Sequence, residues 1–340
     1  MSRVLAVRLD SDGDVLLTGP AVRALGALGP VDLLVAPQAV GAGALLPGVE
    51  RVLPFAAPWT GYRPPPFDAA EVARVVGALS GRYARAVVFT SAHQSPLPAA
   101  LLLRMAGVGF VAATSEDYPG SLLDVRHRRA DGRHEVQAAL DLARAAGGHL
   151  RPGDDGGLAV RRPLPDVAPL LPGRPYVVLH PGASVPARAP RPADARAYAA
   201  ALAADGWAVL VTGGSTERAL TAAVAGGLPG VHDLGGRTDL PALAAVLAGA
   251  AAAVVGNTGP AHLAAAVRTP VVSLFAPVVP AGRWAPFGVP SVLLGDQAAA
   301  CAGSRARACP VPGHPCLAGV DPAAVVAAVD RLVVREGVPA

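Results

Sequence analysis

Lysine is absent from this 340-residue chain, so all 29 of its basic residues are arginine. They are scattered among Ala, Gly, Pro and Val, and the net charge is only +4. Nucleic-acid grooves combine a basic stripe with interleaved aromatic residues, and only 4% of these residues are aromatic. The composition therefore predicts no nucleic-acid partner, and the abundance of arginine reflects a coding bias rather than a function.

Long hydrophobic runs are also missing, although 52% of the residues are hydrophobic. The longest run, at 243–256, is rich in alanine and shorter than the ~20 residues of a membrane-spanning helix. Arg8 and Asp10 interrupt the first apolar run before it could form a signal-peptide core. We therefore expect a cytoplasmic protein without a transmembrane helix. Peripheral contact with the inner face of the membrane is compatible with this expectation.

Cysteine is scarce, and Cys301, Cys309 and Cys316 all lie in one proline-rich segment that also holds His314. The wide spacing of these cysteines matches none of the short paired-ligand patterns of structural zinc sites. Reduced thiols or one local disulfide are favoured over zinc, and we expect no metal and no cofactor.

Two nucleotide-binding motifs are missing as well. Neither half of the chain has G-x-G-x-x-G after its first strand, and no G-x-x-x-x-G-K-[ST] occurs. Hydride transfer and nucleoside triphosphate hydrolysis both lose support from these absences.

Short apolar runs alternate with helix-like segments, which is typical of βαβ units and parallel sheets. The alternation stops in a proline-rich stretch at 161–175 and then restarts. We predict an α/β fold with two Rossmann-like domains, at 1–165 and 174–325, joined by this linker. A last helix at 321–335 either stays with the second domain or packs back on the first.

Four loops rich in small residues each follow an apolar run in the second half, at 180–184, 212–217, 234–238 and 256–262. The carboxyl ends of parallel strands share one edge of a sheet, where ligands of such folds bind. We therefore expect the four loops to gather there and to hold a nucleotide diphosphate between the two domains.

The loop GNTGPAH at 256–262 reads as the start of a helix that could bind an anion. Asn257 or Thr258 could cap this helix, and Pro260 suits its first turn. Free N–H groups and the helix dipole favour a diphosphate there, and His262 could add a donor. An ordinary capped helix with a partly buried histidine remains an equal alternative.

The segment SDGDV after the first strand places Asp10, Asp12 and Asp14 close together. Asp14 stands where a helix begins, so it could be an N-cap. The alternative is a general base that deprotonates an acceptor hydroxyl. Position alone favours the cap.

Four motifs resemble those of the ADP-heptose lipopolysaccharide heptosyltransferase family, glycosyltransferase family 9. They are SDGDVLLTGPAVRALG, HPGASVPARAPRP, TGGSTERAL and GNTGPAHLAAAVRTPVVSLFAPVVPAGRWAPFG, in this order across nearly the whole chain. The resemblance implies a GT-B fold whose N-terminal domain binds the acceptor and whose C-terminal domain binds an ADP-sugar. It also implies inversion at the sugar carbon without a metal.

The resemblance assigns roles residue by residue. Asp14 matches the catalytic base, Arg188 matches the donor-phosphate cation, and Glu217 falls near the acidic residue that contacts the ribose. The rest of the expected donor site is Ser184, Asn257, Thr258, Gly259, Pro260 and His262 for the phosphates, with Gly213 and Gly214 for the nucleoside. Weaker acceptor candidates are Gly13, His93 and Gln94. Arg188 and Glu217 could instead be a solvated arginine and a first-turn helix acid.

Two features depart from the family pattern. Asn257 stands where many members carry Asp, and an amide repels a diphosphate less. The sequence Ala-Pro-Arg-Pro at 189–192 replaces a frequent Trp-Pro pair, so either Arg188 or Arg191 could be the phosphate ligand.

The segment RHRRADGRHE at 126–135 is the densest basic cluster of the chain. It could meet an anionic sugar, a phosphate or a membrane, although such runs are more often solvated faces. Taken together, the sequence predicts an inverting glycosyltransferase of cell-envelope polysaccharide biosynthesis that moves heptose from an ADP-linked donor to a glycan or glycolipid hydroxyl. A nucleotide-sugar 2-epimerase and a non-catalytic nucleotide-sugar-binding protein are the alternatives.

Overall fold

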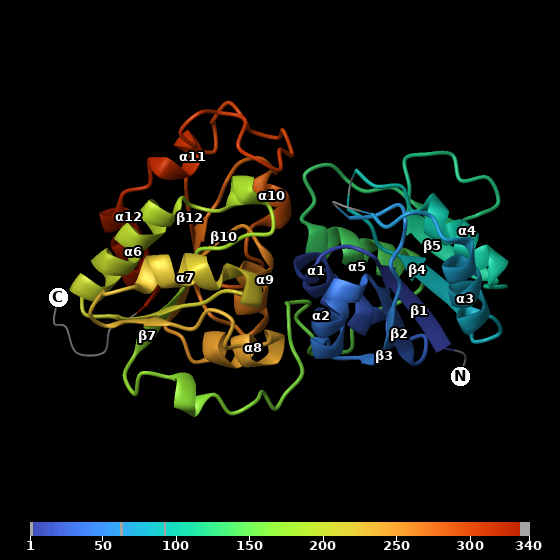
Figure 1. Cartoon of the computed structure of the whole chain (residues 1–340). Coiled ribbons are helices and arrows are strands. Elements are labelled where there is room, and N and C mark those ends of the chain that lie inside the picture. The colour runs from blue at the N-terminus through green and yellow to red at the C-terminus, as the bar shows by residue number, and fades with distance from the viewer. Residues whose placement is uncertain (1–2, 62–63, 92, 334–340) are drawn as a thin grey trace. The chain divides into compact units, whose positions relative to one another are not determined.

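The computed structural model describes residues 3–61, 64–91 and 93–333. The chain divides into two compact units, residues 1–161 and 162–340, and the division falls at the start of the predicted linker. Each unit contains one six-stranded sheet whose paired strands are all parallel. The predicted α/β class with two Rossmann-like domains is confirmed (Figure 1).

The N-terminal unit has the strand order β3-β2-β1-β4-β5-β6. Its strands are β1 Arg3–Arg8, β2 Val31–Val35, β3 Val49–Pro54, β4 Tyr83–Val88, β5 Phe110–Thr114 and β6 Val125–His127. Its α-helices are α1 Asp12–Leu25, α2 Val40–Leu45, α3 Ala69–Leu79, α4 Leu97–Met105 and α5 Glu135–Ala145, with a 3₁₀ turn η1 at Pro37–Ala39. Helix α1 packs against α2 and α5, and α3 packs against α4. The apolar residues of β1 and β4 are buried on both faces, as expected for a parallel sheet covered by helices.

The C-terminal unit has the strand order β12-β11-β10-β7-β8-β9. Its strands are β7 Tyr176–His180, β8 Ala208–Val211, β9 Val231–Asp233, β10 Ala252–Gly256, β11 Val271–Leu274 and β12 Ser291–Leu294. Its α-helices are α6 Pro192–Ala204, α7 Arg218–Ala225, α8 Leu240–Ala248, α9 Gly259–Ala266, α10 Ala281–Trp284, α11 Pro315–Ala318 and α12 Pro322–Leu332. The 3₁₀ turns are η2 Ala168–Leu170, η3 Pro186–Arg188 and η4 Ser215–Glu217. Helices α6 and α7 pack together, and so do α8 and α9.

Helix α12 belongs to the core of the C-terminal unit. Its residues Val325, Ala328 and Val329 are fully buried in the same cluster as β7, β8 and α6. The helix contacts α6 and the strands β10, β11 and β12. The apolar face of α12 is therefore buried within its own unit, and packing of this helix on the N-terminal domain stays a prediction.

The cysteine segment follows β12. Cys301, Cys309 and Cys316 are all free thiols, so the local disulfide is not formed. Burial is the largest of the effects that raise the pKa of Cys316 to about 11, so this thiol stays protonated at neutral pH. Among the residues that the structure describes, no three His, Cys, Asp or Glu side chains form a group that could hold a metal ion. In the same part of the chain, no helix is long and apolar enough to cross a membrane.

Candidate functional site

The four small-residue loops of the C-terminal unit meet at the carboxyl edge of its sheet. They follow β7, β8, β9 and β10, which are neighbours in the sheet. Gly236 donates its N–H to the carbonyl of Gly213 at 2.8 Å, which joins the loops after β8 and β9. A Cβ on Gly256 would lie 2.6 Å from the carbonyl oxygen of Arg188, so only glycine lets these two backbones approach. The loops thus form one closely packed set, as predicted.

Glu217 lies inside this set of loops. Its Oε2 accepts the N–H of Gly214 at 2.8 Å, so it caps the start of η4, whose N-cap residue is this glycine. A Cβ on Gly182 would lie 1.9 Å from Oε1 of Glu217, so the carboxylate fills the space beside the β7 loop. Glu217 therefore fits both interpretations. It is an acid at the start of a helix, and its carboxylate also lies among the loops that are expected to hold the nucleoside.

His180, at the end of β7, is the nearest histidine to this carboxylate. Its Nε2 lies 3.8 Å from Oε2 of Glu217, and its Nδ1 is 3.0 Å from the hydroxyl of Thr212. Burial lowers the pKa of His180 and outweighs the opposite effect of Glu217. His180 is therefore neutral at neutral pH and supplies no counter-charge to Glu217.

The N-terminus of α9 is the predicted anion site. Thr258 occupies the N-cap position without making a side-chain cap, and Pro260 lies in the first turn. The buried Thr258 hydroxyl has no hydrogen-bond partner among the described residues. An uncapped helix start that presents the N–H of Gly259 and a spare hydroxyl is suited to an anionic ligand. His262 lies one turn further along and is buried, with 5% of its surface exposed.

Asn257 has a different position from the one expected. Its side-chain N–H₂ donates to the carbonyl of Ala276 at 3.2 Å, and its Oδ1 accepts the N–H of Ala276 at 3.3 Å. Because both ends of this buried amide are bonded to the backbone after β11, Asn257 does not cap α9. It instead ties the α9 loop to the neighbouring strand.

The structure distinguishes the two candidate phosphate arginines. Arg191 makes a bidentate pair with Asp194, with Nε at 2.6 Å and Nη2 at 2.7 Å from the two carboxylate oxygens. Arg188 ends η3 beside Gly256, and its buried Nε has no hydrogen-bond partner in the described part of the chain. A buried guanidinium N–H without a partner is costly unless a ligand satisfies it. This geometry favours Arg188.

In the N-terminal unit, Asp14 is not a helix cap. Helix α1 begins at Asp12 after the N-cap residue Ser11, so Asp14 is its third residue. Oδ1 of Asp14 accepts a hydrogen bond from Nη2 of Arg8 at 2.9 Å, and Oδ2 accepts one from the Ser11 hydroxyl at 2.7 Å. The side chain remains 21% exposed, so its carboxylate is both oriented and reachable.

Arg8, at the end of β1, holds this cluster together. It is only 3% exposed, donates to the Ser91 hydroxyl at 2.9 Å, and places Nε 2.9 Å from Oδ2 of Asp10. Burial raises the pKa of Asp10 and outweighs the lowering effect of Arg8. Burial also raises the pKa of Asp12, to about 6. The three acids of the predicted SDGDV cluster thus have different surroundings.

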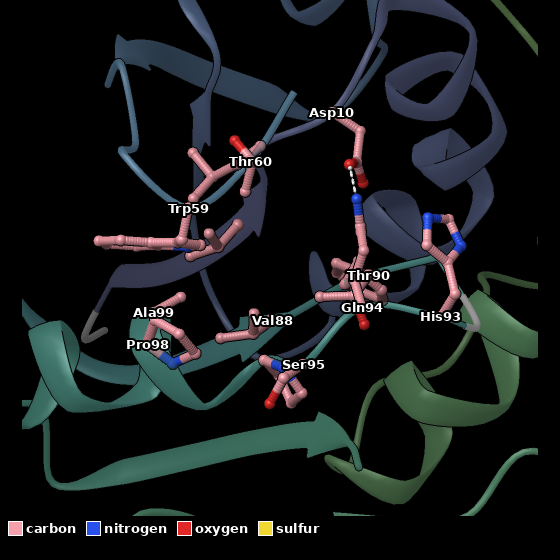
Figure 2. Close-up of a pocket in the computed structure, with 14 residues that line it drawn as sticks. Asp10, Trp59, Thr60, Val88, Thr90, His93, Gln94, Ser95, Pro98 and Ala99 are labelled. Carbon is pink, nitrogen blue, oxygen red and sulfur yellow. Dashed lines mark hydrogen bonds between the residues drawn. The ribbon is translucent and has the colours of Figure 1, made fainter. Parts of the chain in front are cut away.

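A pocket of about 270 Å³ lies beside this cluster, at the carboxyl ends of β1 and β4. Trp59, Thr60, His93 and Gln94 line it together with Asp10, as Figure 2 shows. Nε2 of Gln94 donates to Oδ1 of Asp10 at 2.6 Å, and Oε1 of Gln94 accepts the N–H of Ser91 at 3.0 Å. The structure therefore brings the predicted residues His93 and Gln94 into one pocket, while Gly13 is buried in the first turn of α1.

The arginines of the segment at 126–135 are engaged within their own unit. Arg129 pairs with Glu135, Arg133 with Asp141, and Arg128 lies 3.6 Å from Glu116. Arg126 donates to the backbone carbonyls of residues 115 and 116. Because carboxylates and carbonyls take up these guanidinium groups, the segment fits the solvated-face reading better than an open anion site.

The sequence alone did not point to three parts of these sites. Arg8 was read only as a break in an apolar run, although a charged residue inside a buried strand is itself a signal for a polar partner. Trp59 and Thr60 follow β3 in a proline-rich stretch without periodicity, so no pattern pointed to their pocket. His180 and Thr212 were noted only as parts of their loops.

Comparisons with known proteins identify the family and the fold of this chain. The family model described as "Glycosyltransferase family 9 (heptosyltransferase)" matches residues 76–313. Lipopolysaccharide heptosyltransferase 1 of Pseudomonas aeruginosa is 34% identical over 210 residues. That match covers 60% of this chain and 58% of the relative, so the chain spans less than two thirds of the curated relative's length.

Solved structures share the fold over nearly the whole chain. Escherichia coli ADP-heptose lps heptosyltransferase II has a TM-score of 0.72 and 19% identity, with 98% of both chains covered. A family 9 glycosyl transferase of Veillonella parvula has a TM-score of 0.76 and 14% identity, with 97% of both covered. The E. coli heptosyltransferase WaaC with ADP has a TM-score of 0.73 and 22% identity, with 97% of this chain and 100% of that one covered. These neighbours confirm the two Rossmann-like domains of the GT-B fold, and the family match shows that the chain belongs to glycosyltransferase family 9.

Proposed function

We propose that this protein is an inverting glycosyltransferase that moves heptose from an ADP-linked donor to a hydroxyl of a glycan or glycolipid. The observation that carries the proposal is the uncapped start of α9 with the neighbouring turn η3, where Thr258 Oγ1 and Arg188 Nε are buried and have no hydrogen-bond partner among the residues that the structure describes. The family match and the P. aeruginosa relative support heptosyl transfer. The E. coli structure described as containing ADP supports the adenine nucleotide.

The C-terminal unit supplies the donor site in this proposal. The guanidinium of Arg188, the N–H group of Gly259 and the Thr258 hydroxyl bind the diphosphate. Negative charge grows on the diphosphate as it leaves, so donors fixed in advance stabilise the transition state more than the ground state. Glu217 accepts hydrogen bonds from the ribose hydroxyls, and the loops around Ser184 and Gly213 approach the nucleotide through their backbones.

Asp14 of the N-terminal unit is the proposed general base. The acceptor hydroxyl oxygen attacks the anomeric carbon of the heptose and loses its proton to the Asp14 carboxylate. The bond from that carbon to the diphosphate oxygen breaks, and ADP leaves with the electron pair. One displacement inverts the configuration, and the positive groups of the donor site balance the charge of the leaving group. No step of this proposal calls for a metal or another cofactor.

The donor half of the proposal is tested first by a thermal-shift panel of ADP, UDP, GDP and dTDP. A ligand that binds only the folded protein raises the melting temperature, so we expect a shift that is selective for ADP. Arg188→Met should abolish that shift, whereas Arg196→Met on α6 serves as a matched control outside the site. A selective shift with another diphosphate contradicts the proposed nucleotide, and no shift with any of them contradicts the donor site.

The catalytic half is tested with Asp14→Asn, an isosteric change that can still accept the Arg8 hydrogen bond. Loss of a general base typically costs ~10²–10⁴ in rate. We therefore expect the ADP shift to persist while mass-spectrometric detection of the heptosylated product falls by about that factor. Transfer at a normal rate in Asp14→Asn contradicts the mechanism. Release of free sugar without an acceptor would point to an epimerase-type reaction, and ADP binding without any turnover would point to a binding protein.

A further inference from the structure

A pocket at the edge of the sheet in the N-terminal unit has no part in the proposed chemistry. It is the pocket of about 270 Å³ beside Asp10 (Figure 2), and Asp14 is not among the residues that line it. We propose that this pocket binds one neutral pyranose ring of the acceptor, stacked on Trp59 and hydrogen-bonded along the side formed by Asp10 and Gln94. The inference rests on the proposed function, because it names the class of acceptor for that enzyme.

Trp59 provides a fixed apolar wall. Its indole packs edge-on against Phe55, with ring centroids 5.6 Å apart and an interplanar angle of 66°. Phe55 is 1% exposed, so the core holds the indole in place. Pro98 and Ala99, at the start of α4, extend the apolar lining. A pyranose presents a face of C–H groups that matches such a rigid aromatic surface at little entropic cost.

Asp10 and Gln94 provide a polar wall whose atoms are already oriented. The amide of Gln94 is fixed at both ends, by Asp10 and by the N–H of Ser91. Each Asp10 oxygen has one charged or amide donor next to it, from Arg8 and Gln94, and a carboxylate oxygen can accept further hydrogen bonds. With Thr60 also in the lining, this side offers acceptors for sugar hydroxyls.

The charges around the pocket favour a neutral ligand. None of the described residues that line it is an arginine, and Asp10 contributes a carboxylate. The nearby basic segment does not offset this, because Arg129 and Arg133 are paired with Glu135 and Asp141. An anionic sugar would thus lose its hydration and meet the Asp10 carboxylate without gaining an arginine partner in the lining, which is unfavourable.

The size of the pocket limits the ligand to about one ring. Ligand pockets usually measure about 300–1,000 Å³, and this one lies just below that range. A single sugar residue with both a C–H face and hydroxyl edges suits the two unlike walls better than an extended chain or a wholly apolar group.

The test is saturation-transfer difference NMR of the full-length protein with methyl β-D-glucopyranoside, methyl α-D-mannopyranoside, methyl β-D-glucuronide and cyclohexanol. We expect at least one neutral glycoside to exceed the glucuronide and cyclohexanol by roughly fivefold or more, with the strongest signals on ring C–H protons. Equal or stronger binding of the glucuronide overturns the charge argument. Binding of cyclohexanol alone overturns the sugar assignment, and no binding by any glycoside overturns the proposal.

Variants locate the binding. Trp59→Leu should abolish the glycoside signals, Trp59→Tyr should retain most of them, and Tyr118→Leu, which changes an aromatic residue that is 85% exposed, should leave them unchanged. If Trp59→Leu does not fold, Gln94→Leu removes the polar wall and should cause the same loss. Unchanged signals in a folded Trp59→Leu or Gln94→Leu protein refute the site. The experiment uses no donor and no turnover, so the ADP shift reports separately whether the proposed function has failed.

Discussion

Arg8 is the residue whose removal should most disturb the N-terminal site. Its buried guanidinium lies 2.9 Å from carboxylate oxygens of both Asp10 and Asp14 and donates to Ser91. Arg8→Met keeps an unbranched side chain of similar length but leaves two carboxylates without their counter-charge. Breaking one buried ion pair in this way costs 3–5 kcal/mol, so we expect the free energy of unfolding to fall by about 4 kcal/mol near neutral pH.

The loss should depend on pH in a predictable direction. Burial already raises the pKa of Asp10, and Arg8 opposes that rise. Without Arg8 the pKa of this carboxyl in the folded protein rises further above its ordinary value of 3.8. If folding raises the pKa of an acid, the protein loses stability as the pH rises from the pKa of the unfolded chain to the raised pKa of the folded protein. The destabilisation by Arg8→Met should therefore be smaller at about pH 5 than at about pH 8.

Urea denaturation followed by far-UV circular dichroism measures this effect at both pH values. The matched control is Arg74→Met, because Arg74 forms an exposed i,i+3 pair with Glu71 at 2.7 Å. Such exposed pairs contribute 0–1 kcal/mol, so the control should shift stability little at either pH. A loss below about 1 kcal/mol for Arg8→Met, or a loss that does not change with pH, would refute the idea that Arg8 holds the carboxylates in place.

Three further predictions follow from other groups. Donors from Arg3, Arg51 and Tyr83 outweigh burial and hold the pKa of Asp32 below its ordinary range, so its stabilisation is present above about pH 4 and lost below it. In urea denaturation Asp32→Asn should cost about 2 kcal/mol at neutral pH and clearly less at about pH 2, because the stabilisation disappears only as the pH falls well below 4, and equal losses would contradict this reading. Burial raises the pKa of Asp12 to about 6, so the protein loses stability as the pH rises from about 4 to 6. Asp12→Asn should raise the melting temperature near pH 8 by an amount equivalent to about 1 kcal/mol, because the helix dipole offsets part of the burial cost; a lower melting temperature would show that the dipole dominates. Gly182→Ala should displace Glu217 and weaken ADP binding in calorimetry by about tenfold, whereas Gly77→Ala, where a Cβ meets nothing within 4 Å, should not.

The regular elements were predictable because parallel strands buried on both faces form short apolar runs. The apolar run that precedes the loop at 180–184 is β7 at Tyr176–His180, and the helix expected to start in the loop at 256–262 is α9 at Gly259–Ala266. Strands β5 and β6 and helix α5 were not identified individually. β6 has three half-buried residues, including Arg126 and His127, and such a short polar edge strand leaves little pattern in the sequence.

The site could be predicted only where the positions of its loops follow from the order of strands along the chain. Strand order brings the four loops of the C-terminal unit to one edge, and that follows from α/β topology. The partners of single side chains do not follow from it. Arg8 reaches Ser91, which lies 83 residues away, and Asn257 bonds to Ala276, 19 residues away, instead of capping α9. Such contacts depend on packing between elements, which local periodicity does not encode.

The three acids of the segment SDGDV show why residue type and position were not enough to choose the base. Asp10 is 9% exposed and both of its oxygens already have donors, from Arg8 and Gln94, so it is suited to accept hydrogen bonds rather than to take up a proton. Asp12 has a pKa of about 6 because of burial and is partly protonated just below neutral pH. Asp14 is 21% exposed and is oriented by Arg8 and by the Ser11 hydroxyl, without serving as the helix cap. Different surroundings thus give neighbouring carboxylates different roles, and Asp14 is the one placed to take a proton from an acceptor.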